Sequence, residues 1–164
     1  MLNKVIILML FIGLISTANA QIQTPQPSPF AKIEQMVGLT QVSLEYSRPA
    51  MRGRTIFGGL VPYGKTWRTG ANMNTKITFA HDVTIDGQEL KKGTYAVYTI
   101  PNEASWEVLF YSDADNGGLP QKWDDSKVAA KTTVSVDKMS FNVESFTMTF
   151  DNLSANSATM GISW

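Results

Sequence analysis

The sequence contains no cysteine and only one histidine, His81. Without cysteine the chain forms no disulfide bond and no thiolate zinc site, and one histidine excludes a centre that needs two imidazoles. Acidic and basic residues balance at 14 each, so no excess of positive charge indicates a nucleic acid or an anionic membrane surface as partner. We therefore predict no cofactor, no metal site and no nucleic-acid partner.

The motifs of common hydrolases and nucleotide-binding proteins are also missing. The chain has no G-x-S-x-G, no H-E-x-x-H and no phosphate-binding glycine loop. His81 stands where one expected strand gives way to the next, which is typical of an exposed turn. Residues 113–124 follow the spacing of a calcium loop in part, but Gly117 stands where an oxygen ligand is needed, which favours a solvated turn. We therefore predict no catalytic residue and favour a non-enzymatic protein. Among the possible functions, an unrecognised hydrolase comes last.

The first 20 residues have the pattern of a secretory signal peptide. Lys4 precedes an apolar run over residues 5–15, and the segment closes with the small-residue motif Ala18-Asn19-Ala20. The run is shorter than the roughly 20 residues that a membrane-spanning helix needs. We predict cleavage after Ala20, export to the periplasm or the medium, and no membrane span in the mature protein.

The rest of the chain divides into a short leader and one domain. Residues 21–30, QIQTPQPSPF, hold three prolines and no apolar period, which indicates an extended leader. Residues 31–164 show short segments of alternating apolar residues separated by turns, and Asp86-Gly87 is typical of a tight hairpin. Many short strands at this spacing predict an all-β fold, a single antiparallel β-sandwich or jelly-roll-like domain.

Three segments give this prediction more detail. Residues 94–100 carry bulky side chains on both faces, which suits a strand in the middle of a sheet covered on both sides. Phe146, Met148 and Phe150 fall on one face only and indicate an outer sheet. Residues 31–38, AKIEQMVG, fit a strand and a short helix equally well.

The segment from residue 48 to residue 72 is the most distinctive part of the chain. It holds four arginines and Lys65 but no acidic residue. Guanidinium groups bind carboxylate, phosphate or sulfate with two parallel hydrogen bonds, and indole faces bind cations or sugar rings. We therefore predict a site for a small anionic or carbohydrate ligand, formed by Arg48, Arg54, Tyr63, Trp67, Arg68 and Asn72.

A structural role for the same residues is the alternative. A long loop that crosses a β-sandwich must satisfy its backbone polar groups, and arginine and asparagine side chains do this well. In that interpretation Arg68 and Asn72 bind loop carbonyls, while Trp67 and Tyr63 close the end of the sandwich. The protein would then be a structural or protein-interaction domain without a small-molecule site.

Four motifs connect the chain with a known family: Y-S-R-P, G-R-x-I-F-G, L-V-P-Y-G-x-x-W-R-T-G-A-N and G-T-Y-x-x-x-T-I-P. Over residues 31–164 the chain resembles the bacterial family called domain of unknown function 2911, exported proteins mainly of Bacteroidetes-type bacteria. The resemblance implies an exported β-rich domain and no established activity. Similar sequences often have an acidic residue at the position of Met73 and continue past that of Trp164 into another strand. We therefore expect no carboxylate at that point of the loop and a shorter last sheet edge.

Overall fold

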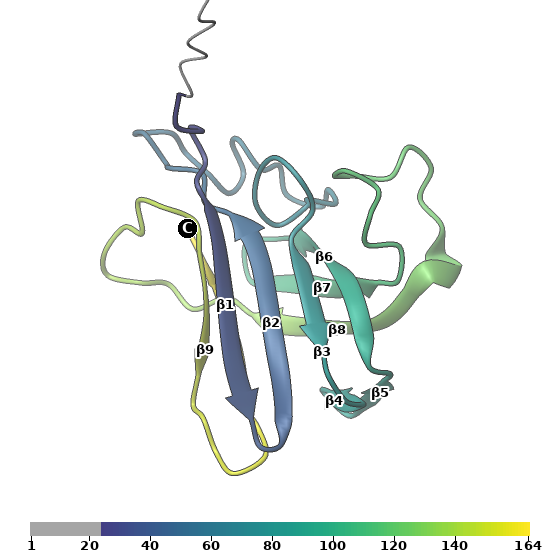
Figure 1. Cartoon of the computed structure of the whole chain (residues 1–164). Helices are drawn as coiled ribbons and strands as arrows, with labels where there is room; N and C mark the ends of the chain where they lie inside the picture. Colours follow the sequence, from purple (N-terminus) through teal and green to yellow (C-terminus); the bar gives the residue numbers. More distant parts are fainter. Residues whose placement is uncertain (1–23) are drawn as a thin grey trace, which may run out of the picture.

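The structure is a computed structural model that describes residues 24–164. The predicted signal peptide, residues 1–20, lies outside the described residues. The described chain is built from antiparallel strands and contains no α-helix (Figure 1). The strands are β1 (Phe30–Val37), β2 (Thr40–Ser47), β3 (Lys76–Phe79), β4 (Val83–Ile85), β5 (Gln88–Leu90), β6 (Gly93–Pro101), β7 (Ser105–Tyr111), β8 (Val128–Ser135), β9 (Thr147–Asp151) and β10 (Thr159–Ser163); a single 3-10 turn, Asp125–Lys127, precedes β8.

One large sheet and two small ones account for all these strands. The large sheet has the order β1-β2-β3-β6-β7-β8, and every neighbouring pair in it is antiparallel. β9 pairs with β10 as a second layer, and β4 with β5 as a short hairpin. The layers share one apolar core, which includes Val42, Leu44, Ile77, Phe79, Val97, Val108, Phe110, Phe146 and Met148. The predicted all-β antiparallel sandwich is therefore confirmed.

β6 occupies the middle of the large sheet and is covered on both faces, as its sequence predicts. Tyr95 and Val97 belong to the core shared by the two layers. Ala96 and Tyr98 belong to a second cluster on the opposite face, where the half-buried Trp123 covers them. The buried hydroxyl of Tyr98 donates to the carbonyl of Gly118 at 2.5 Å, which anchors the loop that follows β7.

Two further expectations concern the first strand and the second layer. The segment that fitted a strand and a helix equally well is the strand β1, in which exposed and half-buried residues alternate and Ile33 packs against the core. β1 begins at Phe30, the last residue of the predicted leader. Phe146, Met148 and Phe150 pack into the core from the second layer, as predicted.

The hairpin predicted at Asp86-Gly87 joins β4 to β5. Asp86 and Gly87 have φ angles of 46° and 81°, the left-handed values that a type I′ turn requires. The hydroxyl of Thr132 on β8 donates to the Asp86 carboxylate at 2.7 Å. The hairpin is therefore anchored beside the outer edge of the large sheet.

Polar side chains take the place of a neighbouring strand at two sheet edges. On β9, the Tyr46 hydroxyl accepts from the N–H of Met148 at 3.1 Å and donates to its carbonyl at 3.3 Å. On β8, the Gln88 side chain donates to the carbonyl of Lys131 at 2.6 Å and accepts from its N–H at 3.3 Å. Unpaired backbone groups on an edge strand invite association with another chain. These two contacts satisfy such groups from within the domain.

Replacing Tyr46 with phenylalanine tests the link between the two layers. Tyr46 is only 3% exposed, so the variant leaves both backbone groups of Met148 buried without a partner. We expect the free energy of unfolding, measured by urea denaturation, to fall by about 1–3 kcal/mol. The control Tyr63→Phe changes an exposed tyrosine and should shift it by less than about 0.5 kcal/mol. Equally small effects in both variants would show that the Tyr46 hydroxyl does not hold the layers together.

Candidate functional site

The loop between β2 and β3 crosses one end of the sandwich; we call residues 48–75 the crossover loop. Its course is fixed where it passes β6, because Trp67 and Thr99 exchange backbone hydrogen bonds of 2.8 and 3.0 Å. The N–H of Gly64 donates to the carbonyl of Pro101 at 2.9 Å. The crossover loop, which precedes β3, therefore continues the hydrogen bonding to β6 past Lys76, the first residue of β3.

Trp67 lies at the centre of an aromatic cluster at this end of the core. Its ring stacks on that of Trp164 at a centroid distance of 5.8 Å and meets Phe146 edge-on at 5.2 Å. Phe57 and Trp106 also meet it edge-on, at centroid distances of 6.1 and 6.5 Å. The indole N–H donates to the carbonyl of Gly70 at 3.2 Å. Trp67 thus closes the end of the sandwich with its ring against four other aromatic rings.

Two of the predicted arginines bind backbone carbonyls. Arg48 donates from Nε to the carbonyl of Phe146 at 3.0 Å and from Nη2 to the hydroxyl of Thr147 at 2.8 Å. Arg54 donates to the carbonyls of Met51 and Ala50 at 2.9 and 2.6 Å. Arg48 therefore ties the end of β2 to the start of β9, whereas Arg54 closes a turn within the crossover loop.

Asn72 fixes the leader to the crossover loop. Its backbone has a left-handed φ of 58°, and its side-chain amide lies 3.2 Å from the carbonyl of Ser28, from Gln26 Oε1 and from the Ser47 hydroxyl. The leader residues are thereby held against the loop. Arg52, which the sequence analysis did not include among the site residues, also reaches the leader.

Arg68 differs from the other arginines because its Nε is buried and has no hydrogen-bond acceptor within residues 24–164. A half-buried arginine normally finds a carbonyl or a carboxylate for this group. The side chain lies beside Gly118, where an added Cβ would be 3.9 Å from its Cδ and Nη1. Arg68 is therefore a half-buried cation with an unused donor.

The unused donor belongs to a residue that borders a concavity of about 410 Å³, which we call the basic pocket. Arg52, Arg54 and Arg68 line it, and no acidic residue does. The remaining walls are Pro27 and Ser28 of the leader, Pro49, Ala50, Leu60, Val61, Gly70 and Ala71 of the crossover loop, and the rings of Trp67 and Trp164. Three of the six predicted residues, Arg54, Trp67 and Arg68, thus meet at one concavity.

The other three predicted residues lie outside the basic pocket. Arg48 does not line the pocket and binds the start of β9, and Asn72 does not line it and binds the leader. Tyr63 is 39% exposed and borders a second, larger cleft between the sheets. The leader wall and Arg52 are the features that sequence reasoning missed. The absence of acidic residues around Arg52 was the one signal that pointed to it.

No guanidinium group of the crossover loop pairs with a carboxylate within residues 24–164. The six ion pairs of the described chain all use lysines. The nearest acidic contact is that of Glu144, whose side chain accepts from the backbone N–H of Arg52 at 2.9 Å. The positive charge of the basic pocket is therefore not neutralised by ion pairing.

The remaining sequence candidates lie in turns and loops outside the basic pocket. His81 is exposed in the turn between β3 and β4. In the loop that resembles a calcium site, Asp113 pairs with Lys127 at 2.9 Å, and Asp115 pairs with Lys76. Within residues 24–164 no group of three acidic or histidine residues is placed to hold a metal ion. No helix in the same range is long and apolar enough to cross a membrane.

The fold and the basic pocket define a two-layered antiparallel β protein whose crossover loop carries uncompensated positive charge. The family model described as Protein of unknown function (DUF2911) matches residues 28–164. The chain belongs to this family, which confirms the resemblance carried by its motifs. No curated protein and no solved structure matches the chain.

Methionine substitutions of two arginines separate scaffold from pocket. Arg48→Met removes hydrogen bonds to the start of β9, and we expect the free energy of unfolding to fall by about 1.5–3 kcal/mol. Arg68→Met removes a cation whose buried Nε has no acceptor within residues 24–164, and we expect the free energy of unfolding to stay unchanged or to rise by up to about 3 kcal/mol. Urea denaturation measures both. A larger loss in Arg68→Met than in Arg48→Met would contradict this division of roles.

Proposed function

We propose that the protein is a non-catalytic binding module for a small ligand with a carboxylate, phosphate or sulfate group. The observation that carries the proposal is the unpartnered, buried Nε of Arg68 in a residue that borders the basic pocket. A turn of the Arg68 side chain toward the pocket would let an anionic oxygen accept a charge-assisted hydrogen bond from this Nε, for which no described residue provides an acceptor.

The size and lining of the basic pocket support a small, compact ligand. Its volume of about 410 Å³ lies within the range of about 300–1,000 Å³ that is common for small-molecule sites. Apolar walls from Leu60, Val61 and Trp164 surround the arginines. This combination suits an anion carried on a sugar or another compact ring, so acidic carbohydrates belong to the proposed ligand class.

The charge of the crossover loop supports the same conclusion. Arg52, Arg54 and Arg68 border one concavity without a carboxylate among its lining residues. Like charges gathered in this way repel one another, and the repulsion is relieved when an anion binds or when salt screens it. A bound anion would therefore raise the stability of the fold.

We also propose that the protein acts after export, as the signal-peptide pattern of residues 1–20 indicates. A Bacteroidetes-type source remains a prediction of the same kind. Expression of the full chain in a Gram-negative host, followed by mass spectrometry of the periplasmic and culture fractions, tests export. We expect the protein there to begin at Gln21; a full-length chain found only in the cytoplasm would contradict it.

A structural role without any ligand is the second candidate, and a specific observation favours it. Arg48, Arg54 and Asn72 all donate to backbone carbonyls, which is what a purely internal scaffold requires. Arg68 distinguishes the two candidates because it does not follow this pattern.

Anion titrations followed by melting temperature test the ligand proposal. We expect phosphate, sulfate or glucuronate to stabilise the protein, whereas glucose, which has no charge, does not. A ligand at 100 times its dissociation constant adds about 2.7 kcal/mol to the unfolding free energy. Arg68→Met should weaken the anion at least about tenfold, the loss of one charge-assisted hydrogen bond.

Lys65→Met is the matched control, because Lys65 is exposed in the same loop and does not line the basic pocket. It removes the same charge and should leave the dissociation constant within about twofold. Equal weakening by Lys65→Met and Arg68→Met would indicate general charge attraction only. No stabilisation by any of the three anions would favour the structural role.

A further inference from the structure

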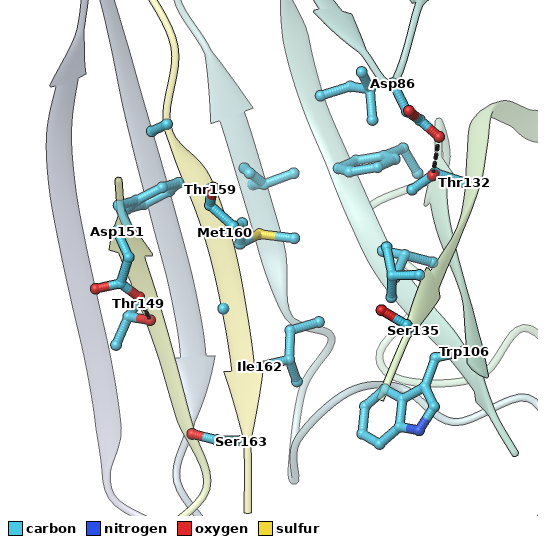
Figure 2. Close-up of a pocket in the computed structure, with 18 of the residues that line it drawn as sticks. Asp86, Trp106, Thr132, Ser135, Thr149, Asp151, Thr159, Met160, Ile162 and Ser163 are labelled. Carbon is cyan, nitrogen blue, oxygen red and sulfur yellow. Dashed lines mark hydrogen bonds between the residues drawn. The ribbon is translucent and has the colours of Figure 1, made fainter. Parts of the chain in front are cut away.

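A second and larger cleft separates β10 from β8. It has a volume of about 1680 Å³ and is distinct from the basic pocket, although Trp164 borders both. In Figure 2, β10 with Met160 and Ile162 forms one side, and Thr132 and Ser135 mark the other. Trp106 lies toward one end and Asp86 toward the opposite end. The cleft is thus long and lies between two strands, each of which has a strand partner on one side only within residues 24–164.

The outer edge of β8 offers free backbone groups to this cleft. Gln88 binds the N–H and the C=O of Lys131 from the side opposite β7. Both backbone groups of Lys131 therefore point away from β7. Backbone direction alternates along a strand, so Thr133 and Ser135 also direct their N–H and C=O outward. Both residues are exposed and line the cleft. The Val136 N–H bonds to Ala104 on the β7 side, which agrees with this alternation.

The facing edge of β10 is open in the same way. The Tyr46 hydroxyl binds the N–H and the C=O of Met148 from the side opposite β10. These backbone groups therefore point away from β10. The cross-strand partner of Met148 is Ile162. By the same alternation, Met160 and Ile162 direct their backbone groups toward the side opposite β9. Two unpaired strand edges therefore belong to the same cleft.

From Thr132 onward, the outer edge of β8 lacks the features that normally block strand addition. Edge strands of soluble proteins are protected by lysine, proline, bulges or covering segments. Gln88 provides such cover at Lys131, but the following sequence, Thr132–Ser135, contains only threonine, valine and serine. The protection stops where the cleft begins.

The apolar side chains and the charges that line the cleft indicate which kind of partner it can bind. Val134, Met139 and Phe141 on the β8 side are 43%, 50% and 64% exposed, which is high for apolar residues that line one concavity. Six acidic residues and two lysines line the cleft: Asp82, Asp86, Glu89, Glu103, Asp137 and Asp151 against Lys91 and Lys138. Only the pair Asp82–Lys91 is an ion pair, at 2.9 Å. The lining therefore complements an apolar and basic partner.

We propose that this cleft binds an extended peptide segment of a protein partner, which adds as a strand along the outer edge of β8. The peptide alternates apolar side chains, which face the core side, with lysine or arginine, which face the acidic residues. Main-chain hydrogen bonds to Thr133 and Ser135 supply affinity that depends little on sequence, and the side chains supply selectivity. This proposal is independent of the anion-binding function, because it uses other residues.

A synthetic peptide, Ac-Lys-Val-Lys-Val-Lys-Val-NH2, tests the proposal by calorimetric titration of the full mature chain. Thr133→Pro removes the outward N–H, whereas Thr133→Ala removes only the side chain. A proline is tolerated at an edge position whose N–H lies outside the ladder. We expect the proline variant to weaken the peptide by about tenfold or more and the alanine variant to leave the dissociation constant within about twofold.

Changes in the peptide itself keep the test valid if the proline variant does not fold. N-methylation at alternate residues removes main-chain donors, and Ac-Glu-Val-Glu-Val-Glu-Val-NH2 reverses the charge. We expect both to bind at least about tenfold more weakly. Undetectable binding of the basic peptide, equal binding of all three peptides, or a protein dimer that blocks the cleft in solution would each overturn the proposal. Arg68→Met should leave peptide binding unchanged, so failure of the anion proposal is recognised separately.

Discussion

The attachment of β9 to the end of β2 is the constraint on which the rest of the structure depends. The second layer consists of only two strands, so little besides its apolar face holds it against the large sheet. Tyr46 satisfies both backbone groups of Met148, and Arg48 binds the carbonyl of Phe146. These contacts place the Phe146 ring against Trp67. The aromatic cluster, the end of the core and one wall of the basic pocket follow from that placement.

The arginines of the crossover loop therefore divide by what their guanidinium groups contact. Arg48 and Arg54 bind backbone carbonyls and give the loop its shape, and Arg54 also lines the basic pocket. Arg68 lies in the loop that they shape, and its buried Nε has no acceptor among the described residues. A polar group that is buried and unsatisfied is unfavourable for folding alone, and the anionic ligand that we propose would supply the missing acceptor.

The sequence predicts most of the fold because the fold depends on short-range patterns. Alternation along β2, bulky side chains on both faces of β6, the Asp86-Gly87 turn and the one-sided apolar face of β9 each correspond to a local rule. The segment of β1 is ambiguous in sequence because a helix and a strand both bury Ile33 there. Its pairing with β2 along eight residues decides the matter.

The site is predicted less completely, since its residues come from distant parts of the chain. The crossover loop is recognisable from its arginines. The pocket wall formed by Pro27 and Ser28 of the leader, however, depends on the hydrogen bond from the Asn72 side chain to the Ser28 carbonyl. Similarly, the open edges of β8 and β10 result from strand order, and a single sequence gives no strand order. Which arginine lacks a partner is also a property of the packed loop.

A ¹H–¹⁵N spectrum of the arginine side chains, recorded during a phosphate titration, tests the division of the arginines most directly. The Nε–H resonance of Arg68 should move in a saturable manner, because this donor has no acceptor in the described chain. The resonance of Arg48, whose Nε already binds Phe146 at 3.0 Å, should stay in place. A stationary Arg68 resonance, or equal shifts of both, would contradict the assignment of Arg68 to a ligand site.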